Sequence, residues 1–324
     1  MKTGLILEGG ASRTLFTCGV LDVLCDEGIK ADYVIGVSAG ICSGTSYVSG
    51  QRGRNYEVDM RYMHDKRYMG LRHMADRNNK SYYNLKFVFE DIPNIHVPFD
   101  FEAFENFGGE VEAAVTNMQT GLAEYLPVTA EDKCFNVLKA SCALPILFPP
   151  IIINGKRYMD GGIADSIPFE RALEKGCEKN IVVLTRRRGY EKRPSKALKL
   201  ITRHYKKYPE FVRAVNTRYI NYNVCLKRLW EAEKSGKVFV IAPEEKITCG
   251  RTDRRRRKRK NQRAVLTIRN LSTKRRTAPR EISRGAVLIG RNHRHVSKTI
   301  TPHLRFCSFS LQLPDTFQQS RKTA

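Results

Sequence analysis

The chain has 324 residues, of which 41% are hydrophobic and 9% aromatic, so it can bury a sizeable core and is not disordered throughout. Its formal charge of +24 is unevenly spread, because residues 254–324 carry 20 Lys and Arg against 2 Asp and Glu, whereas residues 1–253 carry 37 against 31. The first 253 residues are therefore only mildly basic, and the overall charge gives no ground for assigning them a function.

The predicted elements begin almost at the first residue. An apolar run at 4–8 predicts a strand, and after Gly9 and Gly10 apolar residues recur near helical spacing up to Gly28, where a helix would stop. A second apolar run at 33–37 follows. Strand, helix and strand in this order form a βαβ unit, which implies a parallel sheet.

Later patterns extend this unit into an α/β domain. Further strands are predicted at 110–115, 151–153, 181–185 and 237–241. Helices are predicted at 130–140 and 168–175, and one or two long amphipathic helices within 196–235. The alternation predicts a three-layer α/β/α domain around a mostly parallel sheet.

The cysteines and the hydropathy indicate a location. Nine cysteines without regular spacing or a C-x-x-C pair argue against a disulfide framework or a zinc site and fit a reducing compartment. The apolar run at 5–7 is too short for a signal peptide, and no stretch approaches the ~18 apolar residues of a membrane-spanning helix. The sequence predicts a cytoplasmic protein that is at most peripherally bound to a membrane.

Residues 36–40 form a G-x-S-x-G pattern with Ser38 at its centre, directly after the second predicted strand. A nucleophile elbow needs a strand, a sharp turn and a helix, with small residues beside the serine so that a strained backbone can expose its hydroxyl. Gly36 and Gly40 supply those small residues. The alternative is a glycine-rich turn in which Ser38 only caps the following helix.

A second signal, at residues 8–13, follows the first predicted strand. Two glycines between a strand and a helix, Gly9 and Gly10, allow backbone N–H groups to point at one spot, where the helix dipole adds positive potential. These are the requirements of an oxyanion hole. The spacing fits neither G-x-G-x-x-G nor the Walker A lysine pattern, which argues against nucleotide binding.

The third signal is Asp160-Gly161-Gly162, although an acidic residue before two glycines is most often a turn. A nucleophilic serine needs a base, and none of the histidines within residues 1–253 lies in a motif: His64, His73, His96 and His204. His204 lies in a basic stretch that reads as a solvated helix face. The Asp160 carboxylate is therefore the best candidate base.

In this order the three signals resemble the patatin-like phospholipases, particularly their bacterial branch. The run Ala-Ser-Cys-Ala-Leu-Pro at 140–145, Phe-Pro-Pro at 148–150 and the approach through Tyr158 and Met159 to Asp160 are also similar to the family's sequence before its catalytic aspartate. The resemblance covers residues 3–250.

The resemblance implies a patatin-like α/β/α sheet domain and a lipid acyl hydrolase with Ser38 as nucleophile and Asp160 as its base. It implies no metal or cofactor, and a phospholipid or another acyl ester as substrate. The oxyanion hole would be formed by backbone amides of the glycine loop with an arginine nearby: Gly9, Gly10, Ala11 and Arg13.

Two positions depart from the family's pattern, and four glycines keep it. Ala11 stands at the third position of the glycine-rich loop, and Thr14 stands where Gly is usual. Ala11 still donates a backbone N–H, so the oxyanion assignment is kept. The two candidate catalytic residues keep the glycines that the G-x-S-x-G and D-G-G motifs require: Gly36, Gly40, Gly161 and Gly162.

Two other functions stay open on sequence grounds. One is a triad esterase of the α/β-hydrolase type that uses Ser38, Asp160 and His204, although an elbow at residue 38 leaves little sheet upstream. The other is a non-catalytic nucleic-acid-binding protein defined by its basic tail. Residues 61–74, rich in Tyr and Met, form either a lipid-facing lid or ordinary core, and basic helices within 186–228 weakly favour anionic membranes.

The composition changes after Asp253, which predicts an acyl hydrolase domain over 1–253 and a separate tail over 254–324. Residues 254–260 are seven consecutive Lys or Arg residues. The tail is either an irregular or disordered segment that binds nucleic acid or anionic lipid nonspecifically through phosphate charge, or the product of a shifted reading frame without selected function.

Overall fold

The computed structural model describes residues 1–247. The predicted tail, 254–324, lies outside the described residues, as does the predicted domain boundary at residue 253. Within the described range, no helix is both long enough and apolar enough to cross a lipid bilayer.

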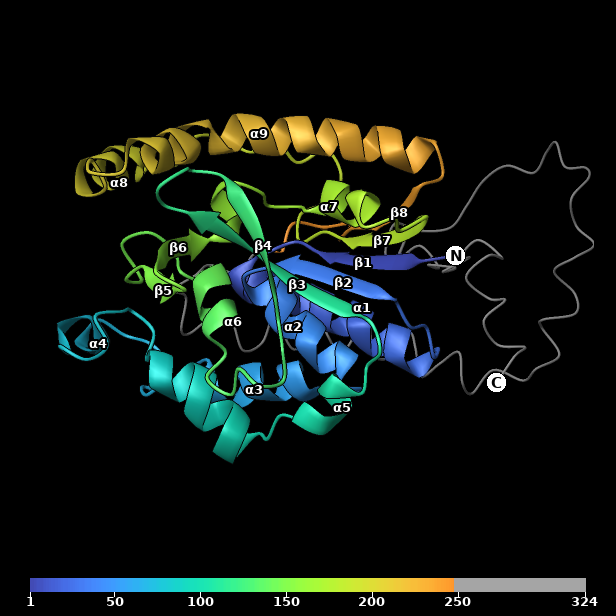
Figure 1. The fold of residues 1–324 in the computed structure, drawn as a ribbon, viewed down its shortest axis with the longest axis horizontal. Coiled ribbons are helices and arrows are strands. Elements are labelled where there is room, and N and C mark those ends of the chain that lie inside the picture. Colours follow the sequence, from blue (N-terminus) through green and yellow to red (C-terminus); the bar gives the residue numbers. More distant parts are fainter. Residues whose placement is uncertain (248–324) are drawn as a thin grey trace, which may run out of the picture. The chain divides into compact units, whose positions relative to one another are not determined.

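A mixed sheet forms the centre of the described part (Figure 1). Its strands are β1 (Thr3–Leu7), β2 (Tyr33–Val37), β3 (Glu110–Asn117), β4 (Ala123–Pro127), β5 (Ile151–Ile153), β6 (Lys156–Asp160), β7 (Lys179–Val183) and β8 (Val238–Ile241). They lie in the order β5-β6-β3-β2-β1-β7-β8, with β4 also paired to β3. The strands from β3 to β8 in this order are parallel, whereas β4, β5 and β6 are joined by antiparallel pairs.

Helices cover both faces of this sheet. The α-helices are α1 (Leu15–Asp26), α2 (Ala39–Val48), α3 (Arg54–Tyr62), α4 (Arg72–Ala75), α5 (Phe101–Glu105), α6 (Asn136–Ser141), α7 (Phe169–Glu174), α8 (Leu198–His204) and α9 (Pro209–Lys234). Two short 3-10 helices, η1 (Ala11–Thr14) and η3 (Gly161–Ile163), and a π-helix, η2 (Phe87–His96), complete the set. In Figure 1, α7 and α9 lie on one face, and α1 and α2 on the other. This arrangement confirms the predicted three-layer α/β/α class.

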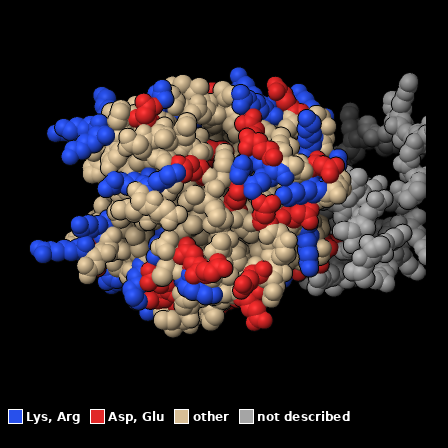
Figure 2. All heavy atoms as spheres, viewed as in Figure 1, with Lys and Arg blue, Asp and Glu red and all other residues tan. Residues whose placement is uncertain are grey.

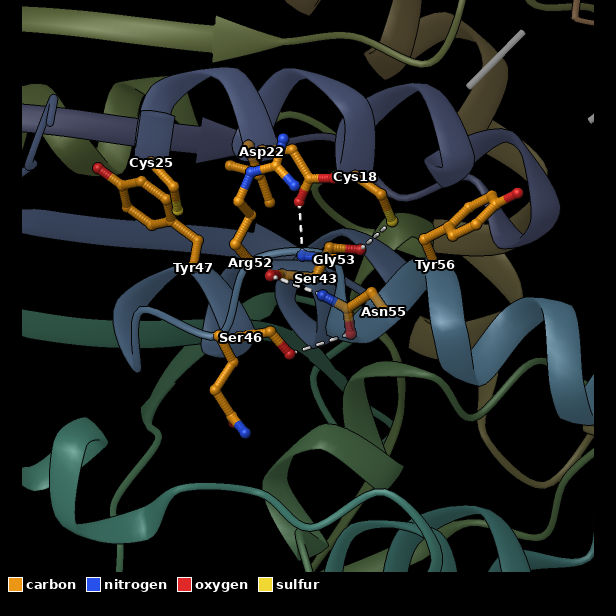
Figure 3. Close-up of a pocket in the computed structure, with 12 residues that line it drawn as sticks. Cys18, Asp22, Cys25, Ser43, Ser46, Tyr47, Arg52, Gly53, Asn55 and Tyr56 are labelled. Carbon is orange, nitrogen blue, oxygen red and sulfur yellow. Dashed lines mark hydrogen bonds between the residues drawn. The ribbon is translucent and has the colours of Figure 1, made fainter. Parts of the chain in front are cut away.

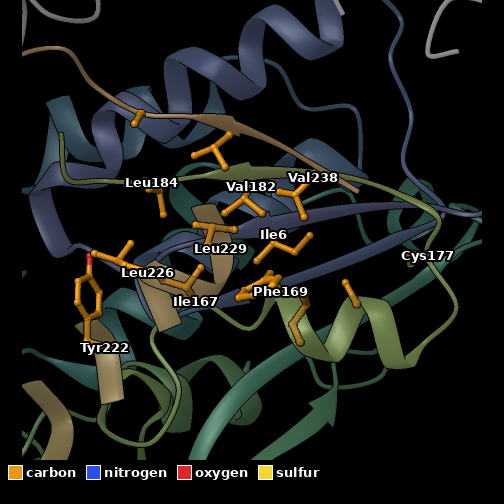
Figure 4. Close-up of a cluster of buried hydrophobic side chains, with 14 of the residues drawn as sticks. Ile6, Ile167, Phe169, Cys177, Val182, Leu184, Tyr222, Leu226, Leu229 and Val238 are labelled. Atoms are coloured by element: carbon orange, nitrogen blue, oxygen red, sulfur yellow. The ribbon is translucent and has the colours of Figure 1, made fainter. Parts of the chain in front are cut away.

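The core forms because alternate residues of each buried strand point to opposite faces of the sheet. Ile6 of β1 points into a cluster that contains Phe169 of α7 and Leu226 of α9, and Figure 4 shows these side chains gathered beneath the strands. Its neighbour Leu7 points the other way and lies against Gly44 of α2. One strand thus anchors a helix on each face.

Two element predictions were wrong in detail. The predicted helix at 130–140 begins only at Asn136, because Phe135 has a φ of 51°, a left-handed conformation that does not continue a helix. The run predicted as a strand at 181–185 leaves the sheet after Val183, because the backbone N–H of Thr185 donates to the side chain of Glu8. The sequence patterns do not predict strands β4 and β6, helices α3 to α5 or the π-helix.

Candidate active site

Ser38 lies in the turn between β2 and α2, at the carboxyl end of a parallel strand. Its φ of 55° and ψ of −134° are costly for a residue with a side chain, so the surrounding contacts have to hold it there. Gly36 and Gly40 allow this turn: a Cβ on Gly36 would lie 2.9 Å from the N of Ile41, and one on Gly40 would lie 2.7 Å from the carbonyl oxygen of Glu8. The G-x-S-x-G pattern therefore forms the tight strand–turn–helix of an elbow.

Ser141, at the end of α6, holds the backbone of Ser38. The N–H of Ser38 donates to Oγ of Ser141 at 2.8 Å, and the same hydroxyl donates to the carbonyl oxygen of Ala114 at 2.7 Å. Ser141 is fully buried. Its position in the motif-like run at 140–145 is the only sequence signal for this role, and that signal alone does not identify the hydroxyl's partners.

The glycine loop after β1 lies directly against Ser38. A Cβ on Gly9 would lie 3.3 Å from the Cβ of Ser38, and one on Gly10 would lie 2.8 Å from the Cγ2 of Thr185. Only glycine therefore lets the backbone come this close to the nucleophile. Ala11 follows with a φ of 48°, and the loop leads into η1, which contains the half-buried Arg13.

Glu8 anchors the start of this loop. Its carboxylate, only 2% exposed, accepts hydrogen bonds from the N–H and the hydroxyl of Thr185, at 2.5 and 3.0 Å, and from the hydroxyl of Tyr222 at 2.7 Å. Burial and the Glu8 charge raise the pKa of Tyr222, which keeps this donor protonated. Sequence reasoning misses both partners, because they lie 177 and 214 residues from Glu8.

The sheet register places Asp160 close to Ser38. Val37 pairs with Ala114 of β3, and Asp160 pairs with the next residue, Val115, on the same edge of β3, because β4 pairs with both Ala114 and Val115 on the opposite edge. Strand β6 therefore pairs with β3 just beyond the point where β2 ends, so Ser38, which directly follows Val37, and Asp160 lie beside each other at one edge of β3. The Asp160 carboxylate is only 3% exposed.

The D-G-G pattern fixes this carboxylate. Oδ1 of Asp160 accepts the N–H of Gly162 at 2.8 Å, at the start of η3. A Cβ on Gly161 would overlap the carbonyl oxygen of Ala114, and one on Gly162 would lie 3.0 Å from Oδ1 itself. The two glycines are required by close contacts rather than by positive φ.

Cys142 lies beside the candidate dyad. Its pKa is influenced by the Ser38 side chain and by the charge of Asp160, so the thiol lies near both. A hydrogen bond with Cys42 and burial hold the pKa of Cys142 well above its usual range, so its thiol is neutral at physiological pH.

A cavity of about 180 Å³ opens beside Ser38. Ser38 and Ala11 form part of its wall. Most of the remaining wall is apolar and includes Val58, Met63, Met69, Phe89, Ile92 and Leu144. Met63, Tyr68 and Met69 come from the 61–74 segment, so this segment forms part of the pocket wall.

A second, much smaller cavity of about 10 Å³ lies behind α2 (Figure 3). Its polar groups bond to one another: the N–H of Gly53 donates to Asp22 at 2.8 Å, and the amide of Asn55 donates to the carbonyl oxygen of Ser43 at 3.1 Å. This space holds about one water molecule. The hydrogen-bonded residues around this cavity pack against α2, and the cavity is too small for a substrate.

Basic side chains gather behind the glycine loop. Burial and the nearby charge of Arg218, with a smaller effect of Arg13, lower the pKa of Lys192 to about 7. The Lys192 ammonium lies 3.9 Å from the ring centre of Tyr222. The guanidinium of Arg218 donates to the carbonyl oxygen of Gly162, so this cluster touches both the loop anchor and the D-G-G turn.

His204 does not lie at this site. It is exposed at the end of α8, and its ring packs against Tyr205 with 4.6 Å between the ring centres. Neither His204 nor Asp160 is among the residues that line the cavity beside Ser38. The structure brings together the glycine loop, Ser38 and the D-G-G turn, but not His204.

Comparisons with known proteins identify the family of the chain. The family model described as patatin-like phospholipase matches residues 5–173, and a domain of unknown function (DUF6363) matches residues 208–261. Lysophospholipase NTE1 of Kluyveromyces lactis is 27% identical over 179 residues, which are 54% of this chain and 12% of that protein. The uncharacterized protein YjjU of Escherichia coli is 26% identical over 189 residues, 57% of this chain and 52% of YjjU.

The chain thus spans only about half of YjjU and a small part of the NTE1 protein. Among solved structures, VipD from Legionella pneumophila aligns with a TM-score of 0.41 and 14% identity over 83% of this chain and 67% of that one. The patatin-like model itself covers the glycine loop, the elbow and the D-G-G turn, which is more than half of the chain. The chain therefore belongs to the patatin-like phospholipase family.

Proposed function

We propose that this protein is a serine lipid acyl hydrolase that cleaves carboxylic esters of phospholipids or other acyl esters with a Ser38–Asp160 dyad. The observation that carries the proposal is the placement of Ser38: it is strained into an elbow, lies against the glycine loop, neighbours Asp160 at the same edge of β3, and lines a mostly apolar cavity. Strain and convergence of this kind are typical of a nucleophile.

The chemistry follows from these positions. Asp160 accepts the proton of Ser38 as Oγ attacks the ester carbonyl carbon. Backbone amides around Gly9, Gly10 and Ala11, with Arg13 nearby, stabilise the negative oxygen of the tetrahedral intermediate. The alcohol leaves with a proton, an acyl-enzyme remains on Ser38, and water then releases the fatty acid.

The base limits the substrate class. A carboxylate has a usual pKa of about 3.9, so it is a weak base at neutral pH, and esters are favoured over amides because they are easier to cleave. The apolar wall of the cavity suits an acyl chain, and the NTE1 relatives are named lysophospholipases. We therefore propose a phospholipid with a reachable acyl ester as the substrate class.

The triad alternative has little support, because His204 is exposed and packs on Tyr205. The non-catalytic nucleic-acid-binding alternative would leave the strained Ser38 and its cavity without a role. His204→Ala separates dyad from triad: full activity supports the dyad, and loss of activity supports the triad.

We also propose a cytoplasmic location with peripheral contact to anionic membranes. Residues 186–207 hold ten Lys and Arg and one acidic residue. Figure 2 shows mainly basic side chains at the end of the molecule where Figure 1 labels α4 and α8, and acidic and basic side chains intermingled elsewhere on that face. Leu71, beside α4, is 76% exposed and Leu200 of α8 is 58% exposed, so apolar side chains accompany the charge.

The decisive experiment combines a fluorophosphonate probe with p-nitrophenyl esters of increasing chain length. Wild-type protein should be labelled and should hydrolyse the esters. Ser38→Ala should lose labelling, and Ser38→Ala and Asp160→Asn should each lower turnover by about a thousandfold or more. Labelling that persists in Ser38→Ala, or full activity of Asp160→Asn, would contradict the proposed dyad.

A further inference from the structure

Two cysteines meet beside the candidate nucleophile. Sγ of Cys42 and Sγ of Cys142 lie 3.6 Å apart. Cys42 lies one helical turn after Ser38 on α2, with its N–H bonded to the carbonyl oxygen of Ser38, and Cys142 follows Ser141 at the end of α6. The pair therefore joins the two elements that hold Ser38.

Both thiols face the cavity beside Ser38. Cys42 and Cys142 contribute to its wall, and both are partly accessible, in contrast to the buried Cys18 and Cys177. A cavity of about 180 Å³ admits a small oxidant as well as an acyl chain. The pair is thus reachable from the same space that the substrate would occupy.

We propose that Cys42 and Cys142 form a reversible disulfide on exposure to a peroxide, and that this bond lowers the activity of Ser38. The effect on activity rests on the hydrolase function proposed above, whereas the formation of the bond does not. The site is a dithiol modification site built into the wall of the substrate pocket.

The chemistry balances with hydrogen peroxide as the oxidant. One thiolate attacks the peroxide and becomes a sulfenic acid while hydroxide leaves, and the second thiol then attacks that sulfur and expels water. Two S–H bonds are lost, one S–S bond forms, and the peroxide is reduced to two waters. Either thiol can make the first attack, because the two sulfurs are adjacent and the other then resolves the sulfenic acid.

Disulfide formation would alter the geometry around Ser38. The sulfurs must approach from 3.6 Å to about 2.05 Å, which moves α2 and the end of α6 relative to each other or turns both side chains. The bond would also remove the free thiol of Cys142 that lies near the Ser38 side chain. Because a shift of about 1 Å can cost on the order of a hundredfold in rate, the oxidised protein should be at least about tenfold less active.

The test treats the full-length protein with hydrogen peroxide, blocks remaining thiols, and maps peptides by mass spectrometry. A peptide pair that links Cys42 to Cys142 and is lighter by two hydrogens is expected, together with reduced p-nitrophenyl ester hydrolysis that dithiothreitol restores. In Cys42→Ala and Cys142→Ala, the ratio of oxidised to reduced activity should rise to near one. Cys134→Ser, at an exposed cysteine outside the cavity wall, should behave like wild type.

Two results would overturn the inference. One is the absence of the linked peptide while other cysteines are oxidised, and the other is a quantitative link without any change in activity. Fluorophosphonate labelling of the reduced protein tells this failure apart from failure of the proposed function. If reduced wild type is not labelled at Ser38, the hydrolase proposal fails, while the peptide map still reports on the dithiol.

Discussion

Two residues of the site, Ser38 and Ala11, have positive φ values, of 55° and 48°. For Ser38 this strain exposes the hydroxyl and therefore has a purpose in the proposed mechanism. Ala11 has no reacting atom, and in the proposed mechanism it contributes only its backbone N–H. The family pattern has glycine there, so the side chain of Ala11 adds strain to the loop without contributing to the chemistry.

Replacing Ala11 with glycine should therefore stabilise the protein. Relief of the left-handed conformation should raise the free energy of unfolding by about 1 kcal/mol, measured by urea denaturation. Ala214→Gly, within the helical α9, is the matched control and should lower it by about 1 kcal/mol. A loss of stability in Ala11→Gly would show that the methyl group makes contacts worth more than the strain.

Ser141 should be a positioning residue for Ser38. In Ser141→Ala, the N–H of Ser38 and the carbonyl oxygen of Ala114 lose their partner, which should cost about 1–3 kcal/mol of stability. A displaced Ser38 should also lower kcat by about tenfold to a hundredfold with KM little changed.

The control for this variant is Ser43→Ala. The Ser43 hydroxyl donates to the carbonyl oxygen of Ala39 within α2, so its removal should change kcat far less. Equal effects of the two substitutions on kcat would show that Ser141 does not position Ser38.

Lys192 should give the stability of the protein a pH dependence. Burial and Arg218 lower its pKa to about 7, so above this pH the unfolded chain binds a proton that the folded protein has released. The free energy of unfolding should therefore rise with pH by up to about 1.4 kcal/mol per pH unit from about pH 7.5 to 9.

Lys192→Met should lack this rise, while Lys199→Met, at an exposed position of α8, should retain it. Urea denaturation across the pH range compares the three proteins. Parallel curves for wild type and Lys192→Met would mean that Lys192 keeps its proton in the folded state throughout.

The motif residues can be found in the sequence because glycines mark them locally. Gly9, Gly36, Gly40 and Gly161 are each forced by a backbone or side-chain contact that a Cβ would violate, so the pattern carries the geometry. Ser141 and Tyr222 carry no such local mark. Their partners come from β2, β3 and the end of β1, and only the folded chain brings those groups together.

At the scale of elements, the crossing of α2 over the end of β1 determines where Ser38 points. A Cβ on Gly40 would lie 2.7 Å from the carbonyl oxygens of both Leu7 and Glu8, which are backbone atoms that cannot move without moving the glycine loop. A Cβ on Gly44, one turn later, would instead meet the end of the Leu7 side chain at 2.7 Å. Gly40 therefore faces backbone atoms that cannot adjust, whereas Gly44 faces the end of a side chain that can.

Gly40→Ala and Gly44→Ala should differ sharply. Gly40→Ala should cost about 1–3 kcal/mol of stability and on the order of a hundredfold in kcat, because α2 and the loop must separate. Gly44→Ala should be close to neutral, since a side-chain shift of Leu7 is offset by up to about 1 kcal/mol of better helix propensity. Thermal unfolding and ester hydrolysis measure both, and a Gly40→Ala protein as active as wild type would contradict this packing argument.

The βαβ core could be predicted, but the elements around the pocket could not. Strands β1 and β2 are short, mostly apolar runs between polar residues, so the hydrophobic pattern predicts both within one residue. Strand β4 has the mixed sequence AEYLP, and its pairing with β3 decides its conformation. The π-helix at Phe87–His96 contains Pro93, which on sequence grounds argues against a helix.

At the scale of the whole molecule, the charge distribution and the family models place boundaries at different residues of the chain. The patatin-like match ends at residue 173, and the second family model runs to residue 261, past the predicted boundary at 253 and through the basic run 254–260. Residues 1–253 keep an excess of only six basic residues, concentrated at 186–207. Two separate regions are therefore candidates for the surface that binds polyanions: 186–207 and 254–324.

Removing residues 254–324 should abolish most binding to polyanions and leave ester hydrolysis intact. These residues carry 18 of the 24 net positive charges, so the shortened chain pairs with fewer phosphate or sulfate groups and its binding should depend less steeply on salt. The truncated protein should leave a heparin column at much lower salt than the full chain. A full-length variant with residues 254–260 replaced by glutamine and serine is the charge control and should elute between them.

The opposite outcome would move the binding surface to the folded part. If truncation left heparin retention unchanged, the basic residues at 186–207 would be the binding surface, and charge reversal at Lys199 and Arg203 should then release the protein at lower salt. Sequencing the gene around codon 253 addresses the separate hypothesis of a shifted frame. A single continuous reading frame through that codon would exclude a frame shift. Residues 254–324 would then belong to the native protein, and the heparin result would apply to it.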